Sequence, residues 1–270
     1  MRKTFATMAL AALLSAACTE SRQQKRSAGE EPEEEPLPER FENDDLPRAA
    51  DELFEDFLYY FASNERLQRR RIAFPLTCSE GGQDTLINEQ QWTMDTLFMG
   101  SGEYAMILDS REQREIANDS ALSKVTLEQI IFASNQMKSY HFCREDGRWM
   151  LTDIALTPLN VTANAEFLDF YHNFATDSLF QQNSLSKEIM FSGPDPDDDF
   201  AQMEGFIDSN SWEAFAPELP SDTLFNLVFT KQDSRSRKKI MLFCGISNGQ
   251  EMEMTFARKR NGWKLEELIE

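Results

Sequence analysis

Histidine and cysteine are scarce in this chain of 270 residues. There are two histidines and four cysteines, Cys18, Cys78, Cys143 and Cys244. None of the cysteines has the C-x-x-C spacing of a redox motif or a zinc site, so we expect no metal ion and no other cofactor. Beyond Cys18 three thiols remain. We expect all three to be structural thiols, and the alternative is that one pair forms a disulfide in an oxidising compartment.

Positive charge is also in short supply. The 27 lysines and arginines face 47 aspartates and glutamates, which gives a formal net charge of −20. Nucleic acids require Lys and Arg to neutralise their phosphates, so this balance excludes a nucleic acid as partner. The short basic runs at residues 69–71 and 235–239 are expected to be solvated edges or loops.

The chain has no apolar run long enough to span a bilayer. A positive n-region at residues 2–3 precedes an apolar stretch at 8–14, which is far shorter than a membrane-spanning helix. The small residues 15–17 then lead to Cys18, an order that resembles a bacterial lipobox. We therefore predict a signal peptide over residues 1–17 and a lipidated Cys18. The alternative is an ordinary small-residue cleavage site that happens to contain a cysteine.

Residues 18–48 are predicted to form a lipidated N-terminus and an acidic, proline-rich disordered tether. Residues 30–45 carry nine acids against one base. Such a segment buries too little apolar surface to offset the entropy of ordering it, and its like charges keep it extended. The predicted location is the bacterial cell envelope. A periplasm-facing position is favoured over the cell surface, because residues 19–22 mix charges where surface-export signals are acidic.

An internal repeat organises the remainder of the chain. The aromatic-rich segment at residues 54–62 returns at 167–175, a shift of 113 positions. Each copy later ends with the same Phe-x6-Trp spacing, at residues 142–149 and 256–263. Two copies of one module, joined by a short connection around Pro158, are therefore expected.

The predicted modules span residues 49–157 and 162–270. Apolar residues at helical spacing predict a first helix in each, and the regions 88–98 and 202–212 are expected to form a second helix. Asp-Gly and Asn-Gly pairs mark hairpin turns between strands. The predicted strands cover 71–77, 104–108, 125–133, 137–144 and 149–155 in the first module, and 224–230, 240–246, 251–258 and 263–269 in the second. The fold class is α+β, with a curved antiparallel sheet that wraps a helix.

This order of helices followed by a curved antiparallel sheet is similar to the nuclear transport factor two-like and cystatin-like cones. The segments Phe-Leu-Tyr-Tyr-Phe-Ala at 57–62 and Arg-Ile-Ala-Phe-Pro-Leu at 71–76 resemble a gut-bacterial lipoprotein family designated domain of unknown function 4348. The resemblance covers about residues 50–270 and implies two tandem cones. The second copy departs from it, because residues 189–192 lack the Pro-Leu ending. The resemblance supplies no catalytic residues.

Cone folds can host acid–base enzymes, so ionisable residues of the first helices are possible catalytic groups. Asp169 and His172 are the catalytic candidates, because such chemistry needs a carboxylate beside a group that titrates near neutrality. The alternative for His172 is a packing role. For Asp169 and its equivalent Asp56, the alternative is that the carboxylate lies on a solvated face of the helix. His141 is expected to face outward from its strand, next to a core phenylalanine.

Three short motifs are also present. Residues 245–249 match G-x-S-x-G, but the alternating sequence that follows predicts a hairpin and not a nucleophile elbow. Residues 195–199 have the spacing of a calcium loop, but the required glycine is absent, and we expect an acidic loop that caps a helix beginning at Phe200. Asp119-Ser120-Ala121 resembles an O-glycosylation sequon of gut anaerobes, with Ser120 as the modified residue.

These features favour an envelope lipoprotein that serves as a non-catalytic binding or scaffolding module. Its expected partners are the membrane, through the lipid anchor, and either another envelope protein or a small apolar or peptide ligand. The alternative is a cone-fold enzyme, similar to a dehydratase or isomerase, that acts on a small apolar substrate through Asp169 or His172.

Overall fold

The computed structural model describes residues 51–195, 198–246 and 248–270, which belong to one compact unit. The predicted signal peptide, Cys18 and the tether lie outside these residues. Within the described ranges, no helix is both long and apolar enough to cross a membrane.

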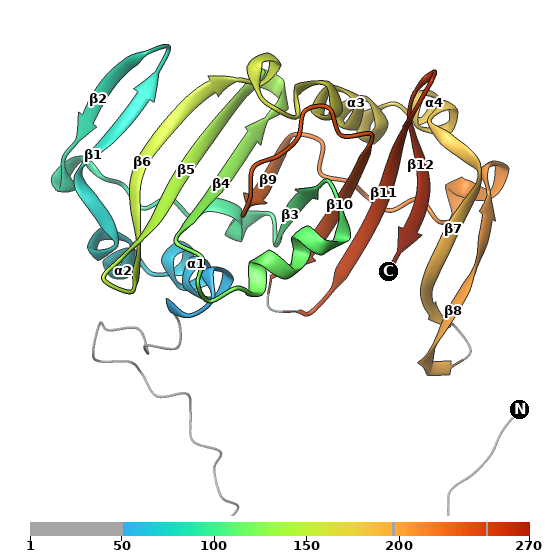
Figure 1. The fold of residues 1–270 in the computed structure, drawn as a ribbon, viewed down its shortest axis with the longest axis horizontal. Coiled ribbons are helices and arrows are strands. Elements are labelled where there is room, and N and C mark those ends of the chain that lie inside the picture. The colour runs from blue at the N-terminus through green and yellow to red at the C-terminus, as the bar shows by residue number, and fades with distance from the viewer. Residues whose placement is uncertain (1–50, 196–197, 247) are drawn as a thin grey trace, which may run out of the picture. The chain divides into compact units, whose positions relative to one another are not determined.

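The described residues form short helices around one large sheet (Figure 1). The α-helices are α1 (Phe54–Ser63), α2 (Glu65–Arg70), α3 (Ala165–Thr176) and α4 (Ser178–Asn183). The 3-10 helices are η2 (Glu89–Gln91), η3 (Leu97–Gly100), η4 (Arg111–Asn118), η5 (Phe132–Ser134), η6 (Leu159–Val161) and η7 (Ser209–Ala214). The strands are β1 (Ile72–Glu80), β2 (Gln83–Ile87), β3 (Glu103–Leu108), β4 (Lys124–Ile131), β5 (Gln136–Glu145), β6 (Arg148–Pro158), β7 (Leu185–Asp195), β8 (Asp198–Asp208), β9 (Thr223–Val228), β10 (Lys238–Gly245), β11 (Glu251–Lys259) and β12 (Gly262–Ile269).

The two halves of the chain produce the same order of elements, and their first helices end in the same way. After α1, the side chain of Asn64 accepts a hydrogen bond from Leu67 N at 3.0 Å and so caps α2. After α3, the side chain of Asp177 accepts hydrogen bonds from the first backbone amides of α4. These caps satisfy amides that the helices cannot satisfy internally, which allows the chain to turn sharply between two short helices.

The helices predicted over 88–98 and 202–212 are absent. The first region contains only η2 and η3 around an extended segment, and the second is the end of β8 followed by η7. Phe206, part of the pattern that predicts a helix, is 71% exposed on β8 and lies opposite Met190 of β7. In the acidic segment 195–199, Asp195 of β7 pairs with Asp198 of β8, and Phe200 lies within β8 where a helix was expected to begin.

All the strands join one twelve-stranded sheet in the order β2-β1-β6-β5-β4-β9-β3-β10-β11-β12-β7-β8 (Figure 1). The third strand of each half lies beside the other half, because β9 pairs antiparallel with β4 and β3 pairs antiparallel with β10. The centre is a parallel contact between β3 and β9. Two separate curved sheets were expected, and this exchange of strands merges the two halves into one sheet.

Each half nevertheless has its own apolar core. Met106 and Leu108 of β3 pack with α1, whereas Ala105 and Ile107 of the same strand pack with α3. Successive residues of a strand point to opposite faces of a sheet. The two cores therefore lie on opposite faces of the shared sheet, and the central strands are buried on both sides.

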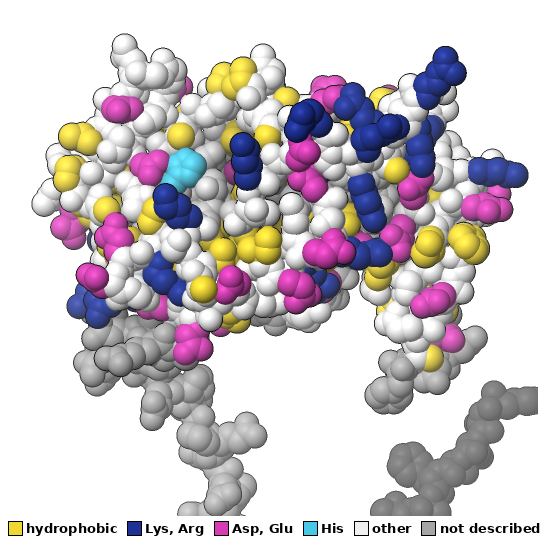
Figure 2. Space-filling model, viewed as in Figure 1, with side chains coloured by type: hydrophobic (Ala, Val, Ile, Leu, Met, Phe, Trp, Pro, Cys, Tyr) yellow, Lys and Arg dark blue, Asp and Glu magenta, His cyan; other side chains and the backbone are white. Residues whose placement is uncertain are grey.

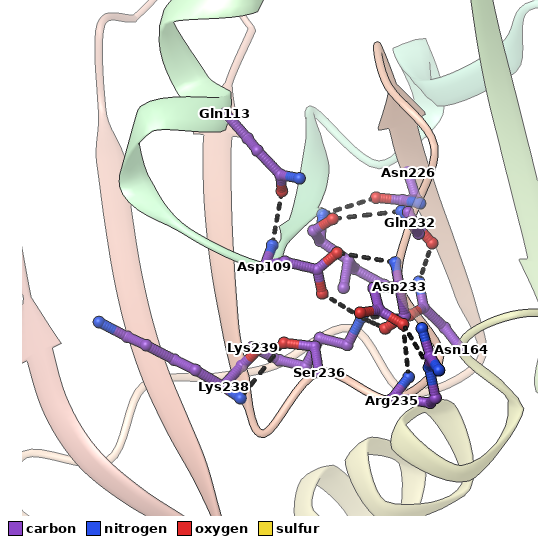
Figure 3. A network of polar contacts seen from close by, with 11 residues as sticks. Asp109, Gln113, Asn164, Asn226, Gln232, Asp233, Arg235, Ser236, Lys238 and Lys239 are labelled. Carbon is purple, nitrogen blue, oxygen red and sulfur yellow. Dashed lines mark hydrogen bonds and ion pairs between the residues drawn. The ribbon is translucent and has the colours of Figure 1, made fainter.

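Polar side chains complete the central seam (Figure 3). The β3–β9 ladder has one residue pair, Ala105 with Asn226. The fully buried Asn226 then uses its side chain, accepting from Ile107 N at 2.8 Å and donating to Glu128 Oε2 at 2.7 Å. Gln232 Nε2 donates to the Ile107 carbonyl at 3.2 Å. Side chains thus replace the backbone partners that Ile107 would have in a longer ladder.

A buried lysine forms the second part of this junction. Lys239 is 2% exposed, and its Nζ donates to Asp109 Oδ1 at 2.6 Å and to Asn164 Oδ1 at 2.8 Å. Asp109 Oδ2 accepts from Asp233 N at 2.8 Å. A buried charge is tolerated only when it is paired and hydrogen-bonded. Figure 3 shows how these contacts connect the end of β3, the start of α3 and the approach to β10.

Side chains of both charges are interspersed on the face shown in Figure 2, where Lys and Arg gather over the upper ends of β10, β11 and β12. The connection that contains η4 reaches β11 and β12 of the second half through the side chains of its arginines. Arg111 pairs there with Glu253 and Glu267, at 2.5 and 2.7 Å. Hydrophobic side chains are exposed over the β7–β8 hairpin (Figure 2), where Met190, Met203 and Phe206 are the exposed apolar residues.

Candidate functional site

The two halves carry equivalent clefts beside their first helices. The cleft of the first half has a volume of about 270 Å³ and is lined by Glu55, Asp56 and Tyr59 of α1, together with Ile246. The shift of 113 residues relates these helix positions to Leu168, Asp169 and His172 of α3, which line a cleft of about 360 Å³ in the second half. The two clefts can therefore be compared position by position.

Three polar side chains meet at the first cleft, where Glu55 and Tyr104 line the cavity and Cys244 lies behind Tyr104. Glu55 comes from the first turn of α1, and Tyr104 and Cys244 are cross-strand neighbours on β3 and β10. The Tyr104 hydroxyl interacts with both the Glu55 carboxyl and the Cys244 thiol. Strand alternation places Tyr104 and Cys244 on the sheet face that packs against α1. The fold thus gathers a carboxyl, a phenol and a thiol from three segments that are distant in sequence.

Burial controls the protonation of this trio. Burial raises the pKa of the Glu55 carboxyl, and the charges of Asp56 and Glu251 add to this effect, while Tyr104 and Arg114 oppose it. Burial also raises the pKa of Tyr104, so the phenol keeps its proton. The pKa of Cys244 is raised to about 12, mainly by burial. Because the thiolate and not the thiol is the nucleophile, Cys244 is inert at neutral pH.

Glu55 has an incomplete set of partners. Its Oε1 atom is buried and accepts no hydrogen bond from any described residue. A buried acceptor without a donor costs about 1–3 kcal/mol, and more when the group is charged. Folded proteins rarely keep such a group, so this atom is available to a donor that enters the cleft.

Aromatic side chains form the rim above Glu55. Tyr59 and Tyr60 are exposed at the mouth, with ring centroids 5.6 Å apart and an interplanar angle of 78°. Phe98 lies against Tyr104 at a centroid distance of 5.5 Å. Among the described residues that line this cleft, there is no lysine or arginine. The cleft therefore combines a buried carboxyl with π faces and hydroxyl groups.

The second half has apolar residues at the three positions of this trio, and one of them, Leu168, lines the second cleft. Leu168 replaces Glu55, and the cross-strand pair Leu224–Ile130 replaces the pair Tyr104–Cys244. Leu168 and Leu224 are each 2% exposed, and Ile130 is fully buried. These three side chains belong to the core of the second half. The polar trio is thus confined to the first half.

Asp169 and His172, the catalytic candidates from the sequence, lie at the edge of the second cleft. Asp169 is exposed, and the half-buried His172 stacks on Phe132 at a centroid distance of 4.6 Å and an interplanar angle of 11°. Both line the same cleft, but no hydrogen bond or ion pair joins these two described residues. Beneath them, Leu168 offers no proton donor or acceptor.

Other residues singled out in the sequence occupy surface positions. His141 is half exposed on β5, 3.8 Å from Asp153, and Asp56 is exposed on α1. Ser120 lies exposed in the loop after η4. Cys78, Cys143 and Cys244 are free thiols.

The G-x-S-x-G segment connects the antiparallel strands β10 and β11, as a hairpin requires, and its Ser247 lies outside the described residues. Within the described part of the chain, no group of three His, Cys, Asp or Glu side chains could hold a metal ion. The calcium-like spacing at 195–199 includes residues 196–197, which also lie outside the described ranges.

A wider groove of about 810 Å³ lies on the other side of the β10 end, between the ends of β10–β12 and the β7–β8 hairpin. Glu103, Glu218, Glu251 and Glu270 contribute carboxylates to it. Burial raises the pKa of Glu103, and Glu251 is paired with Arg114. None of the groove's described side chains has a buried polar atom without a partner, so the groove lacks the feature that distinguishes the Glu55 cleft.

The Glu55 site is not predicted by the sequence pattern. That pattern points to Asp56 and its repeat Asp169, whereas the buried acceptor belongs to the neighbouring Glu55. A comparison of the two copies could have revealed the site. Glu55, Tyr104 and Cys244 are polar, and each aligns with an apolar residue of the other copy. Finding that signal requires knowing that β3 lies beside β10.

Comparisons with known proteins agree with this fold. A family model described as "Domain of unknown function (DUF4348)" matches residues 33–270. A crystal structure of an NTF2-like protein from Bacteroides fragilis NCTC 9343 is similar to this chain with 38% sequence identity and a TM-score of 0.77. The similarity covers 83% of this chain and 98% of the other. The comparison with curated proteins gave no match.

Proposed function

The chain belongs to the DUF4348 family and has an NTF2-like α+β fold, and from this premise we propose that it is a non-catalytic binding protein whose ligand site is the Glu55 cleft. The observation that carries the proposal is the contrast between the halves. Both copies keep the same helix with a cleft beside it, but among the described residues only the first cleft is lined by a side chain with a buried, unpartnered carboxyl oxygen.

Further features support binding over catalysis. Cys244 holds its proton at neutral pH, and Tyr104 acts only as a hydrogen-bonding group. A cleft of about 270 Å³ is at the lower end of the range for ligand pockets, which limits the ligand to a small molecule or one side chain of a peptide.

We place this binding protein in the bacterial cell envelope, anchored by lipid on Cys18, with residues 19–48 as the spacer. The support is the order of n-region, apolar segment, small residues and cysteine in the sequence, followed by an acidic, proline-rich stretch. The two halves are then tandem cone modules that exchange their third strands, a description supported by their equivalent elements and clefts.

A compound screen by thermal unfolding tests the binding function. A ligand at 100 times its Kd adds about 2.7 kcal/mol of stability. Glu55→Leu installs the residue of the second half, so compounds that stabilise the wild type should have little effect on this variant. Glu204→Gln, an exposed position on β8 outside the cleft, serves as the control for loss of one carboxylate. Equal responses of wild type and Glu55→Leu to every compound would exclude the Glu55 cleft as the ligand site.

The rival function is an enzyme that uses Asp169 or His172 at the second cleft. The observation in its favour is that both residues line one cavity. If the wild type turns over a compound and either Asp169→Asn or His172→Gln abolishes that turnover, the proposed non-catalytic binding function is wrong.

A further inference from the structure

The buried Oε1 atom of Glu55 needs a hydrogen-bond donor, and its charge needs a counter-ion. Neither is supplied by the described residues that line the cleft. The charge of Arg114 acts on this carboxyl, but Arg114 is paired with Glu251. A ligand that carries both a positive charge and N–H donors would supply what the site lacks.

The surrounding side chains suit a cation as well. Tyr59, Tyr60, Tyr104 and Phe98 line the cleft, and an aromatic face attracts an ammonium group through its quadrupole. The exposed Asp56 at the mouth adds negative potential. The chain as a whole carries a formal charge of −20, which favours the approach of cations and disfavours anions.

The second cleft provides an internal comparison. Leu168, Leu224 and Ile130 replace the trio there and cannot pair with a cation. The carboxylates that line this cleft, Glu166 and Asp169, are exposed. Its rim has His172 at the position of Tyr59, and Asn173 at that of Tyr60. The carboxyl and the tyrosine rim therefore occur together in the first half and are both replaced in the second.

From this arrangement we propose that the Glu55 cleft binds a small organic cation, a primary or methylated ammonium group, with the ammonium against Glu55 Oε1 and its carbon substituents against the tyrosine rim. This inference rests on the proposed binding function and names its ligand class. The volume of about 270 Å³ admits an alkylammonium or a lysine-like side chain but not a large polycation.

The pH dependence of binding follows from burial of the carboxyl. Burial raises the pKa of Glu55 in the free protein, and a bound cation favours the ionised form. Cation binding therefore releases protons when the pH is near or below that pKa. Affinity should fall about tenfold for each pH unit below it, because the carboxyl must first lose its proton.

The test is isothermal titration calorimetry at fixed ionic strength with n-butylammonium and tetramethylammonium as probes, and with 1-butanol and butyrate as neutral and anionic counterparts. Glu55→Gln keeps the shape of the side chain and removes its charge, whereas Glu204→Gln removes an exposed carboxylate on β8, outside the cleft. We expect saturable binding of the cations to the wild type, at least tenfold weaker binding to Glu55→Gln, and less than a threefold change for Glu204→Gln. Circular dichroism checks that both variants are folded.

The outcomes separate this inference from the function on which it rests. If 1-butanol or butyrate binds as tightly as the cations and Glu55→Gln weakens that binding, the site is real but the cation assignment is wrong. Equal loss of cation affinity in both variants means attraction by net charge alone and also overturns the assignment. If none of the probes binds while the compound screen yields Glu55-dependent ligands without a positive charge, the proposed function stands and the ammonium ligand class is rejected.

Discussion

The Trp92 indole donates a hydrogen bond to Gln68 Oε1 at 2.9 Å, and the same bond recurs in the other half of the chain between Trp212 and Gln181, also at 2.9 Å. Each glutamine also donates to a carbonyl of the preceding helix, Phe61 O or Phe174 O. This glutamine joins the two short helices to the following segment, and it explains why a tryptophan stands where a helix was expected.

Replacing these glutamines should destabilise the two halves unequally. Gln68 is fully buried and also bonds the backbone of Asp95, whereas Gln181 is half-buried and has fewer partners. An unsatisfied buried polar group costs about 1–3 kcal/mol, so Gln181→Leu should lose about that much and Gln68→Leu more. Urea unfolding measures both. Equal losses would show that the additional bonds of Gln68 add no stability.

The tail tryptophans provide a second test of the repeated framework. Trp149 is fully buried and Trp263 is 5% exposed, and their rings lie 4.9 Å from Phe54 and 5.2 Å from Phe167. Removing such a side chain leaves a large cavity, so Trp149→Ala and Trp263→Ala should each cost about 3–5 kcal/mol. Denaturant unfolding with Trp149→Phe and Trp263→Phe as milder controls measures this. A loss under 1 kcal/mol for either alanine variant would contradict its place in the core.

The strand meander and the first helix of each half were predictable because their signals are local. Alternating apolar residues and Asn-Gly or Asp-Gly turns gave β5 and β6, as well as β11 and β12, to within a few residues. The helical spacing of the aromatic residues likewise predicted α1 and α3. Such patterns report which face of an element is buried, and that is determined within the segment itself.

The second helices and the strand exchange could not be predicted in this way. In the region 202–212 the spacing of Phe206 and Trp212 suggested a helix, but Phe206 faces solvent on β8 and Trp212 is buried after it. The strands β3 and β9 are both short and apolar, and their sequences do not specify which of β4 or β10 they pair with. That choice depends on Asn226, Gln232 and Lys239, whose partners are distant in sequence. The Glu55 site could not be predicted for the same reason, because Glu55, Tyr104 and Cys244 are distant in sequence and meet only in the folded chain.

The central seam has a predicted dependence on pH. Burial raises the pKa of Glu128, while its hydrogen bond from Asn226 opposes the shift. Between the ordinary glutamate value and this raised value, the folded state binds more protons than the unfolded state, so stability falls as pH rises through that window. Glu128→Gln removes this titration. The variant should therefore exceed the wild type in stability at pH 8, and the difference should shrink toward pH 4.

Urea unfolding at a series of pH values checks this, with Glu115→Gln on the exposed η4 segment as a control for loss of one carboxylate. A wild-type advantage at pH 8 would mean that the Asn226 bond outweighs burial, and it would contradict the predicted sign.

The anchor prediction depends on Cys18 alone. Two or more acyl chains give stable membrane attachment, so Cys18→Ala should move the protein from the membrane pellet to the soluble or unprocessed fraction. Cell fractionation with metabolic acyl labelling measures this, and Cys78→Ala controls for loss of a thiol that lies in the folded part. Retention of Cys18→Ala in the pellet, still processed and labelled, would exclude lipidation at this residue.

The central claim is that Glu55 is a buried carboxyl that acquires its partner from a ligand. Side-chain ¹³C NMR of protein labelled at the glutamate carboxyls follows this group directly, and the Glu55 signal is identified by its loss in Glu55→Gln. The account predicts that this signal titrates above the range of ordinary glutamates in the free protein. It also predicts that saturating n-butylammonium moves the titration to lower pH. A Glu55 signal that titrates as an exposed glutamate, and that no bound compound shifts, would contradict the account.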